Sequence, residues 1–156
     1  MTGQARKEIK QRKPLRRLED EAFVNIQRTA DALMQGVATS LKGKDLSPPQ
    51  YNVLRILRGA GDGGLACQEI AERMISRDPD ITRLLDRLEE RDLVTRSRDR
   101  ADRRVITIRI TEWGLRVLGE LDEPIQKLHV GQLGHLGPER LRSLIDLLDS
   151  ARRAHA

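Results

Sequence analysis

The sequence predicts a mainly α-helical protein with a small β-wing. Apolar side chains recur with the period of a helix over residues 81–88, and apolar and polar side chains then alternate with the period of a strand over residues 105–110. Helical patterns also precede and follow this segment, over residues 15–42 and from residue 112 onward. Together these patterns predict a helical protein that contains one short pair of β-strands.

Composition and charge narrow the possible functions. The chain has 156 residues, of which 38% are hydrophobic and 34% are charged. No apolar run approaches the roughly 20 residues that cross a bilayer, and the basic N-terminus lacks the apolar segment of a secretory signal. We therefore expect a cytoplasmic protein with no membrane partner. The net charge of +5 favours a polyanion, and a single Phe, Tyr and Trp are too few to stack single strands, which favours a duplex.

We divide the chain into a basic flexible tail, residues 1–13, and a single domain, residues 14–156. Within that domain, residues 46–111 form the predicted core, and residues 14–42 and 112–153 form long amphipathic helices on either side. A core of this size cannot cover both apolar stripes. The uncovered stripes need a partner, and a second copy of the chain is the simplest one.

The core begins with a capping box. Ser47 and Gln50 flank two prolines at the start of a helix. Residues 65–67 then fit a short edge strand, and residues 68–74 fit a short helix. Asp78 fits the N-cap of the next helix, with a proline at its first position.

That next helix carries cations on the face opposite its apolar stripe. The stripe consists of Ile81, Leu84, Leu85 and Leu88. Arg83 projects from the opposite face and Arg87 from its edge. Two helices joined by a few residues, the second of them cationic, form a helix-turn-helix. The strand pair after it makes the motif a winged helix-turn-helix.

The loop between the two strands is rich in arginine. Five arginines fall within nine positions: Arg96, Arg98, Arg100, Arg103 and Arg104. A cationic helix followed by a cationic hairpin suits duplex DNA, because the helix can enter the major groove and the hairpin the adjacent minor groove. The alternative is a charged loop tip that only prevents aggregation between sheets.

The C-terminal part is helical again. Pro124 lies within its apolar stripe, so the helix either kinks there or restarts before it. Trp113 and Tyr51 are expected in the core, although they can also wall a pocket beside the long helices.

Four segments of the chain resemble the MarR (multiple-antibiotic-resistance-regulator) family of bacterial winged-helix transcription factors. They are LSPPQYNVL (residues 46–54), EIAERM (69–74), ITRLLDRLEERDLV (81–94) and DRADRR (99–104), the last followed by Ile110, Thr111 and Gly114. The order and spacing of all four carry the resemblance, which covers about residues 15–153. It implies a homodimer held by the N- and C-terminal helices, a near-palindromic operator in double-stranded DNA, repression of genes and release by a small-molecule effector.

The resemblance also assigns roles to single residues. Thr82, Arg83 and Arg87 would face bases or phosphates. Asp102 would orient Arg104, and either Arg104 or the arginine before it would enter the minor groove. The predicted DNA-binding residues are Arg77, Asp80, Thr82, Arg83, Arg87, Arg98, Arg100, Asp102, Arg103 and Arg104.

The chain departs from the family pattern at two positions. Arg77 stands where the family often has serine, and it adds charge near the groove. Asp92 stands where the family has glycine, and aspartate can adopt the left-handed conformation needed there. Asp80 is unusual so close to phosphate. It either pairs with Arg83 or Arg77, or accepts from a cytosine amino group.

Other readings of these residues remain open. Arg83 and Arg87 can form a solvated helix face, with Asp86 and Glu90 as ion-pair partners. The protein as a whole can be a sequence-neutral architectural DNA binder instead of a regulator.

A further alternative makes the single cysteine, Cys67, the sensor of a redox-sensing regulator, although a small buried packing residue suits its surroundings better. No enzyme is predicted, since no catalytic constellation or phosphate loop appears. We expect no cofactor, and no metal site, because His129 and His135 do not share a helix face.

Overall fold

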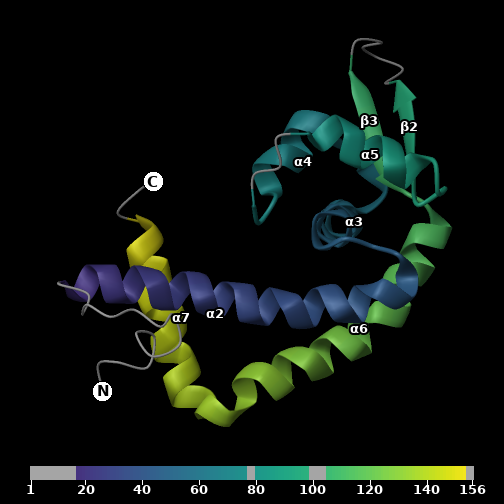
Figure 1. The fold of residues 1–156 in the computed structure, drawn as a ribbon. Helices are drawn as coiled ribbons and strands as arrows, with labels where there is room; N and C mark the ends of the chain where they lie inside the picture. The colour runs from purple at the N-terminus through teal and green to yellow at the C-terminus, as the bar shows by residue number, and fades with distance from the viewer. Residues whose placement is uncertain (1–16, 77–79, 99–104, 154–156) are drawn as a thin grey trace.

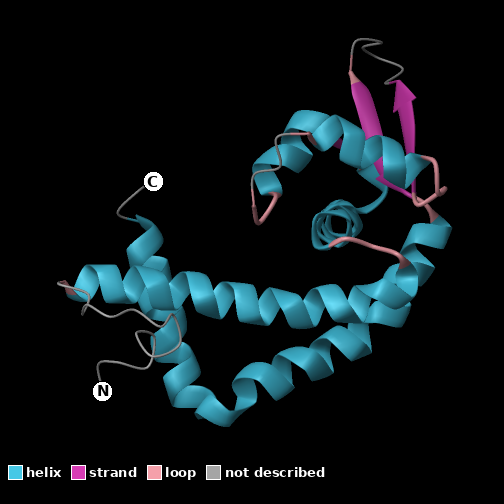
Figure 2. Cartoon of the chain, viewed as in Figure 1, coloured by secondary structure: helices cyan, strands magenta, loops and turns pink. Residues whose placement is uncertain are grey.

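The structure is a computed structural model that describes residues 17–76, 80–98 and 105–153. Two long helices, α2 and α6, run along one side of the molecule, and the short helices and strands gather on the other side (Figure 1). Figure 2 shows that helix predominates and that the strands form one small sheet. The elements in chain order are α2 (Leu18–Leu41), η1 (Lys42–Lys44), α3 (Pro48–Ala60), η2 (Gly61–Gly63), β1 (Leu65–Ala66), α4 (Cys67–Arg73), α5 (Ile81–Glu89), β2 (Val94–Arg98), β3 (Ile106–Ile110), α6 (Glu112–Leu133), η3 (Gly134–Leu136) and α7 (Gly137–Arg153). The predicted fold class, mainly α with a small β-wing, is confirmed.

Helices α2 and α6 approach each other closely at Gly36. A Cβ atom at Gly36 would lie 2.6 Å from Nε2 of Gln132. That amide nitrogen donates to the carbonyl of Leu33 at 3.1 Å, so it ties the two helices together. Helix α7 crosses α2 near the N-terminal end of α2 (Figure 1). The predicted tail, residues 1–13, lies outside the described residues.

The capping box predicted for α3 is present. The backbone N–H of Ser47 donates to Oε1 of Gln50 at 2.9 Å, and the backbone N–H of Gln50 donates to Oγ of Ser47 at 3.4 Å. At the other end of α3, both terminal nitrogens of Arg58 donate to the carboxylate of Asp122 on α6 at 2.8 Å. This hydrogen-bonded pair lowers the pKa of Asp122 and raises the pKa of Arg58.

The three strands form an antiparallel sheet in the order β1-β3-β2. Ile108 of the central strand pairs with Leu65 on β1 and with Arg96 on β2. Its side chain is 1% exposed and packs into the core beneath the sheet. The central strand β3 therefore anchors the wing to the core through the buried side chain of Ile108, and β2 lies at one edge of the sheet.

A tight junction joins the end of α5, the wing and the start of α6. Asp92 has a φ of 55°, the left-handed conformation predicted for it. Its carbonyl accepts a 2.6 Å hydrogen bond from the hydroxyl of Thr111, and that hydroxyl in turn accepts from the backbone N–H of Gly114 at 2.9 Å, which caps α6. A Cβ atom at Gly114 would lie 2.4 Å from the carbonyl oxygen of Leu93. Only glycine fits this position without a shift of the backbone.

The core lies where α2, α3, α5, α6 and the sheet meet. Its largest fully buried side chains are Leu41, Leu54, Leu57, Ile70, Leu85, Leu88, Leu93, Ile108 and Leu118. Of the two alternatives predicted at Pro124, the restart is excluded, since α6 continues through this residue. The proline lies on the exposed side, where water can satisfy the carbonyl that its missing N–H leaves unpaired. The prediction of a core position is wrong for Trp113, which is 47% exposed, and is confirmed for Tyr51, which is buried.

Among the helices of the described residues, none combines the length and the apolar character needed to cross a membrane.

We predict that Gly114→Ala lowers the free energy of unfolding by about 1–3 kcal/mol, because the new methyl group meets a carbonyl oxygen that cannot easily move. Gly119→Ala, on the same helix, is the matched control. A Cβ atom there meets nothing within 4 Å, so this change should stabilise the helix by about 0.5–1 kcal/mol. Urea unfolding of both variants measures the difference. Equal effects of the two substitutions would show that the junction tolerates a side chain.

Candidate nucleic-acid interface

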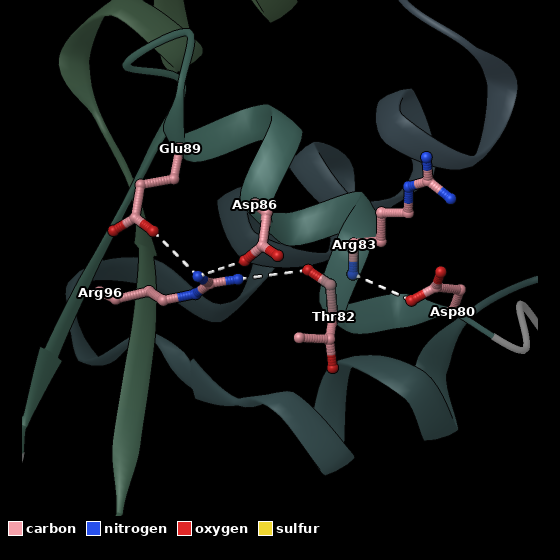
Figure 3. Close-up of polar contacts among 6 residues, drawn as sticks. All are labelled: Asp80, Thr82, Arg83, Asp86, Glu89 and Arg96. Atoms are coloured by element: carbon pink, nitrogen blue, oxygen red, sulfur yellow. Dashed lines mark hydrogen bonds and ion pairs between the residues drawn. The ribbon is translucent and has the colours of Figure 1, made fainter.

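The recognition helix α5 begins at Ile81, and Asp80 is its N-cap. One carboxylate oxygen of Asp80 accepts from the backbone N–H of Arg83 at 3.2 Å (Figure 3). The prediction that Asp78 caps this helix is therefore wrong. Both aspartates can cap, but Asp80 directly precedes the first residue of the apolar stripe. Asp80 binds the amide of Arg83, so its role as a cap accounts for an acidic residue beside the surface that is predicted to face DNA.

The exposed face of α5 carries the three predicted contact residues. Thr82, Arg83 and Arg87 are exposed, while Leu85 and Leu88 on the opposite face are 1% and 0% exposed. Within the described part of the chain, the guanidinium groups of Arg83 and Arg87 form no hydrogen bond or ion pair. Two cations on a rigid helix are thus available to an external ligand.

The acidic residues of α5 are paired with the wing instead. Nη1 of Arg96, on β2, lies 2.6 Å from a carboxylate oxygen of Asp86 and 3.0 Å from one of Glu89. Its Nη2 donates to the carbonyl of Thr82 at 3.3 Å. Figure 3 shows this guanidinium lying between the two carboxylates, while the Arg83 side chain points away from them. The alternative in which Asp86 pairs with the arginines of its own helix is therefore not what the structure has.

The alternation of side chains along β2 could have indicated that Arg96 pairs with the acidic residues of α5. Val94 is buried, and Arg96 lies two residues later on the same face of β2, so its side chain points toward α5. From the sequence, Arg96 is predicted only as one of the wing cations. Arg98, two residues further along the same face, is exposed and has no partner among the described residues.

A second arginine, Arg109 on β3, fixes the base of the wing. Its Nε donates to the carbonyl of Asp62 in η2 at 2.9 Å, and its Nη1 donates to Oγ of Ser97 on β2 at 2.6 Å. Arg109 is not among the residues predicted from the sequence to form the site. The two bonds hold both strands and the loop before β1 in one arrangement, so the wing leaves the core in a defined direction.

Half of the predicted contact residues lie outside the described residues. They are Arg77, Arg100, Asp102, Arg103 and Arg104. Their roles at the tip of the wing and before α5 stay predictions. The structure does place the residues around them, since β2 ends at Arg98 and β3 begins at Ile106.

The other candidate residues lie away from this surface. Cys67 begins α4, is half-buried and packs against the core. His129 is exposed on α6 and His135 is exposed on η3. Across residues 17–76, 80–98 and 105–153, no three His, Cys, Asp or Glu side chains group as metal ligands would.

Comparison with known proteins identifies the family to which the chain belongs. The sequence profile of the MarR family matches residues 46–106, the segment from the start of α3 to the start of β3. The crystal structure of a MarR transcription factor from Planctomyces limnophilus is 40% identical, with a TM-score of 0.67 over 86% of this chain and 98% of that one. The chain belongs to the MarR family.

Two further relatives of this MarR-family chain are a repressor and a regulator that was solved with a bound ligand. The HTH-type transcriptional repressor MdtR of Bacillus subtilis is 34% identical over 61% of the chain, and the chain spans 63% of the length of MdtR. CouR from Rhodococcus jostii RHA1, solved with bound p-coumaroyl-CoA, is 26% identical with a TM-score of 0.74, over 88% of this chain and 95% of CouR. The matching relatives are transcription regulators, which supports the prediction that this MarR-family chain is not an enzyme.

Proposed function

We propose that the chain is a sequence-specific DNA-binding transcription regulator that acts as a homodimeric repressor. The observation that carries this proposal is the cationic face of α5. Arg83 and Arg87 are exposed, their guanidinium groups have no partner among residues 17–76, 80–98 and 105–153, and the carboxylates of Asp86 and Glu89 are paired with Arg96. A helix that presents directional donors in this way suits the edges of bases in the major groove.

The wing supplies the second contact. Arg98 is exposed at the end of β2 and would reach phosphate. Arg103 or Arg104, with Asp102 as the orienting partner, would enter the minor groove. Arg77 and Arg100 would add further contacts to DNA phosphates. These contacts fix the protein on the duplex, while Thr82 and the arginines of α5 read its sequence.

Sequence-specific binding is favoured over architectural binding by the chemistry of the two projections. Architectural proteins insert apolar wedges between base steps and bend the duplex. The predicted wing tip, residues 99–104, is polar and rich in arginine, and the exposed face of α5 carries hydrogen-bond donors. We therefore assign sequence reading to α5 and anchoring to the wing.

The dimer is proposed from the apolar faces of α2 and α7. Phe23 and Ile26 on α2 are 61% and 47% exposed, and Ile145 and Leu147 on α7 are 56% and 69% exposed. Between the two helices lies an apolar groove of about 360 Å³, lined by side chains that include Leu33 and Ile145. Apolar surface of this extent is expected to be covered by a second copy, which would place two α5 helices on successive major grooves.

Release by a small-molecule effector is part of the proposal. It is supported by CouR, a relative whose structure contains an acyl-CoA ligand. Repression is supported by MdtR, a relative named as a repressor. The effector of this chain would act by favouring a dimer in which the two α5 helices no longer match the spacing of the grooves.

We predict that Arg83→Ala weakens binding to a duplex selected from genomic fragments by about 5- to 150-fold, the range expected for loss of a bidentate base contact. Binding to a random duplex of the same length should weaken much less. Fluorescence titration with unlabelled random duplex as competitor measures both affinities. Wild-type protein should prefer the selected duplex by about a thousandfold or more.

Arg140→Ala is the matched control for this experiment. It removes the same charge from the exposed surface of α7, which lies away from α5 (Figure 1). Both affinities should stay close to those of the wild type. An equal loss of specific and non-specific binding by the Arg83 variant would make Arg83 a phosphate contact, and a wild type without preference would refute sequence-specific regulation.

We predict that the chain sediments as a dimer at micromolar concentration and that Ile145→Glu shifts it toward monomer, because a charge would be buried in the proposed interface. Ile75→Glu is the matched control. Ile75 is 85% exposed, follows α4 and does not line the apolar groove between α2 and α7, so this change should leave the dimer intact. A monomeric wild type, or equal behaviour of the two variants, would contradict the assignment of this surface.

A further inference from the structure

Arg96 on β2 and Arg83 on α5 are alternative partners for the same carboxylate, that of Asp86. Asp86 follows Arg83 by three positions in the helix, a spacing at which opposite charges attract. If these two side chains paired, the guanidinium of Arg83 would be drawn along the helix and away from an incoming base. In the structure the carboxylate of Asp86 is instead 2.6 Å from Nη1 of Arg96.

The surroundings of Arg96 favour this second pairing. The Arg96 side chain is 25% exposed, whereas those of Asp86 and Glu89 are 49% and 40% exposed. Its backbone is held in the ladder opposite Ile108, the buried centre of the sheet. A half-buried guanidinium on a fixed strand loses less side-chain entropy on pairing than Arg83, which is exposed on the helix. Arg96 therefore outcompetes Arg83 for Asp86.

We propose that Arg96 is a positioning residue that determines DNA binding through Arg83. It holds the carboxylate of Asp86 away from Arg83, and it neutralises two carboxylates that would otherwise face phosphates. Its bond to the carbonyl of Thr82, at 3.3 Å, also fixes the first turn of α5 relative to the wing. This inference rests on the proposed function, since it concerns the same surface, but Arg96 itself does not contact DNA.

A double-mutant cycle in DNA binding tests the proposal. Arg96→Ala should weaken binding to the selected duplex by about tenfold, within the range seen for coupled neighbours. Asp86→Asn should have little effect in the wild type but should recover most of the lost affinity in the Arg96→Ala background. If the gain from Asp86→Asn is the same in both backgrounds, the substitution only removes a charge near DNA and the proposal is wrong.

Arg98→Ala is the matched control, because Arg98 lies two residues along the same strand face and has no partner among the described residues. Loss of a phosphate contact there should reduce the slope of log affinity against log salt by about 0.9. Arg96→Ala should leave that slope unchanged. A slope reduced equally by both changes would make Arg96 a phosphate contact and would overturn the inference.

A measurement without DNA separates this inference from the proposed function. In urea unfolding of the free protein, Arg83→Ala and Asp86→Asn should act additively when Arg96 is present. They should become coupled in the Arg96→Ala background, because Arg83 and Asp86 then pair. This result would support the role of Arg96 even if wild-type protein showed no preference for any duplex. Additive effects in both backgrounds would show that Arg96 does not prevent Arg83 and Asp86 from pairing.

Discussion

The ion-paired contact between β2 and α5 is the interaction on which the proposed DNA-binding surface depends. One guanidinium, that of Arg96, meets the carboxylates of Asp86 and Glu89 and the carbonyl of Thr82. Ion pairs this exposed contribute only about 0–1 kcal/mol each to stability, so their importance is geometric. They connect the helix that would read bases to the strand that carries the wing. Among the residues that the structure describes, the guanidinium groups of Arg83 and Arg87 then have no partner.

The wing and the long helix α6 are connected by a second, backbone-based constraint. The left-handed Asp92, the hydroxyl of Thr111 and the missing side chain of Gly114 bring the end of α5, the end of β3 and the start of α6 to one point. The bidentate pair of Arg58 and Asp122 holds α6 against α3 further along. A displacement of α6 would therefore be transmitted to α3 and to the base of the wing, which would couple the proposed dimer helices to the proposed DNA-binding surface.

Much of the fold could be predicted from the sequence, because periodicity and capping are local properties. The capping box at Ser47 and Gln50, the apolar stripe of α5 and the left-handed Asp92 were all evident in short stretches of residues. Two errors arose where the choice depended on tertiary contacts. Both Asp78 and Asp80 were suitable caps, and Trp113 stays 47% exposed, with the guanidinium of Arg116 over its ring. The pairing of Arg96 with α5 was not predicted because it joins residues on different elements, and only the alternation of β2 pointed to it.

The central claim is that the cationic face of α5 enters the major groove, once in each of two copies. Methylation of guanine N7 in the selected duplex tests this most directly, because that atom lies in the major groove and accepts from arginine. We expect methylation to block binding at two clusters of guanines centred about 10 base pairs, or a multiple of that spacing, apart. Binding that is unaffected by methylated guanines but blocked by ethylated phosphates would contradict the account, since the protein would then grip the backbone without reading the groove.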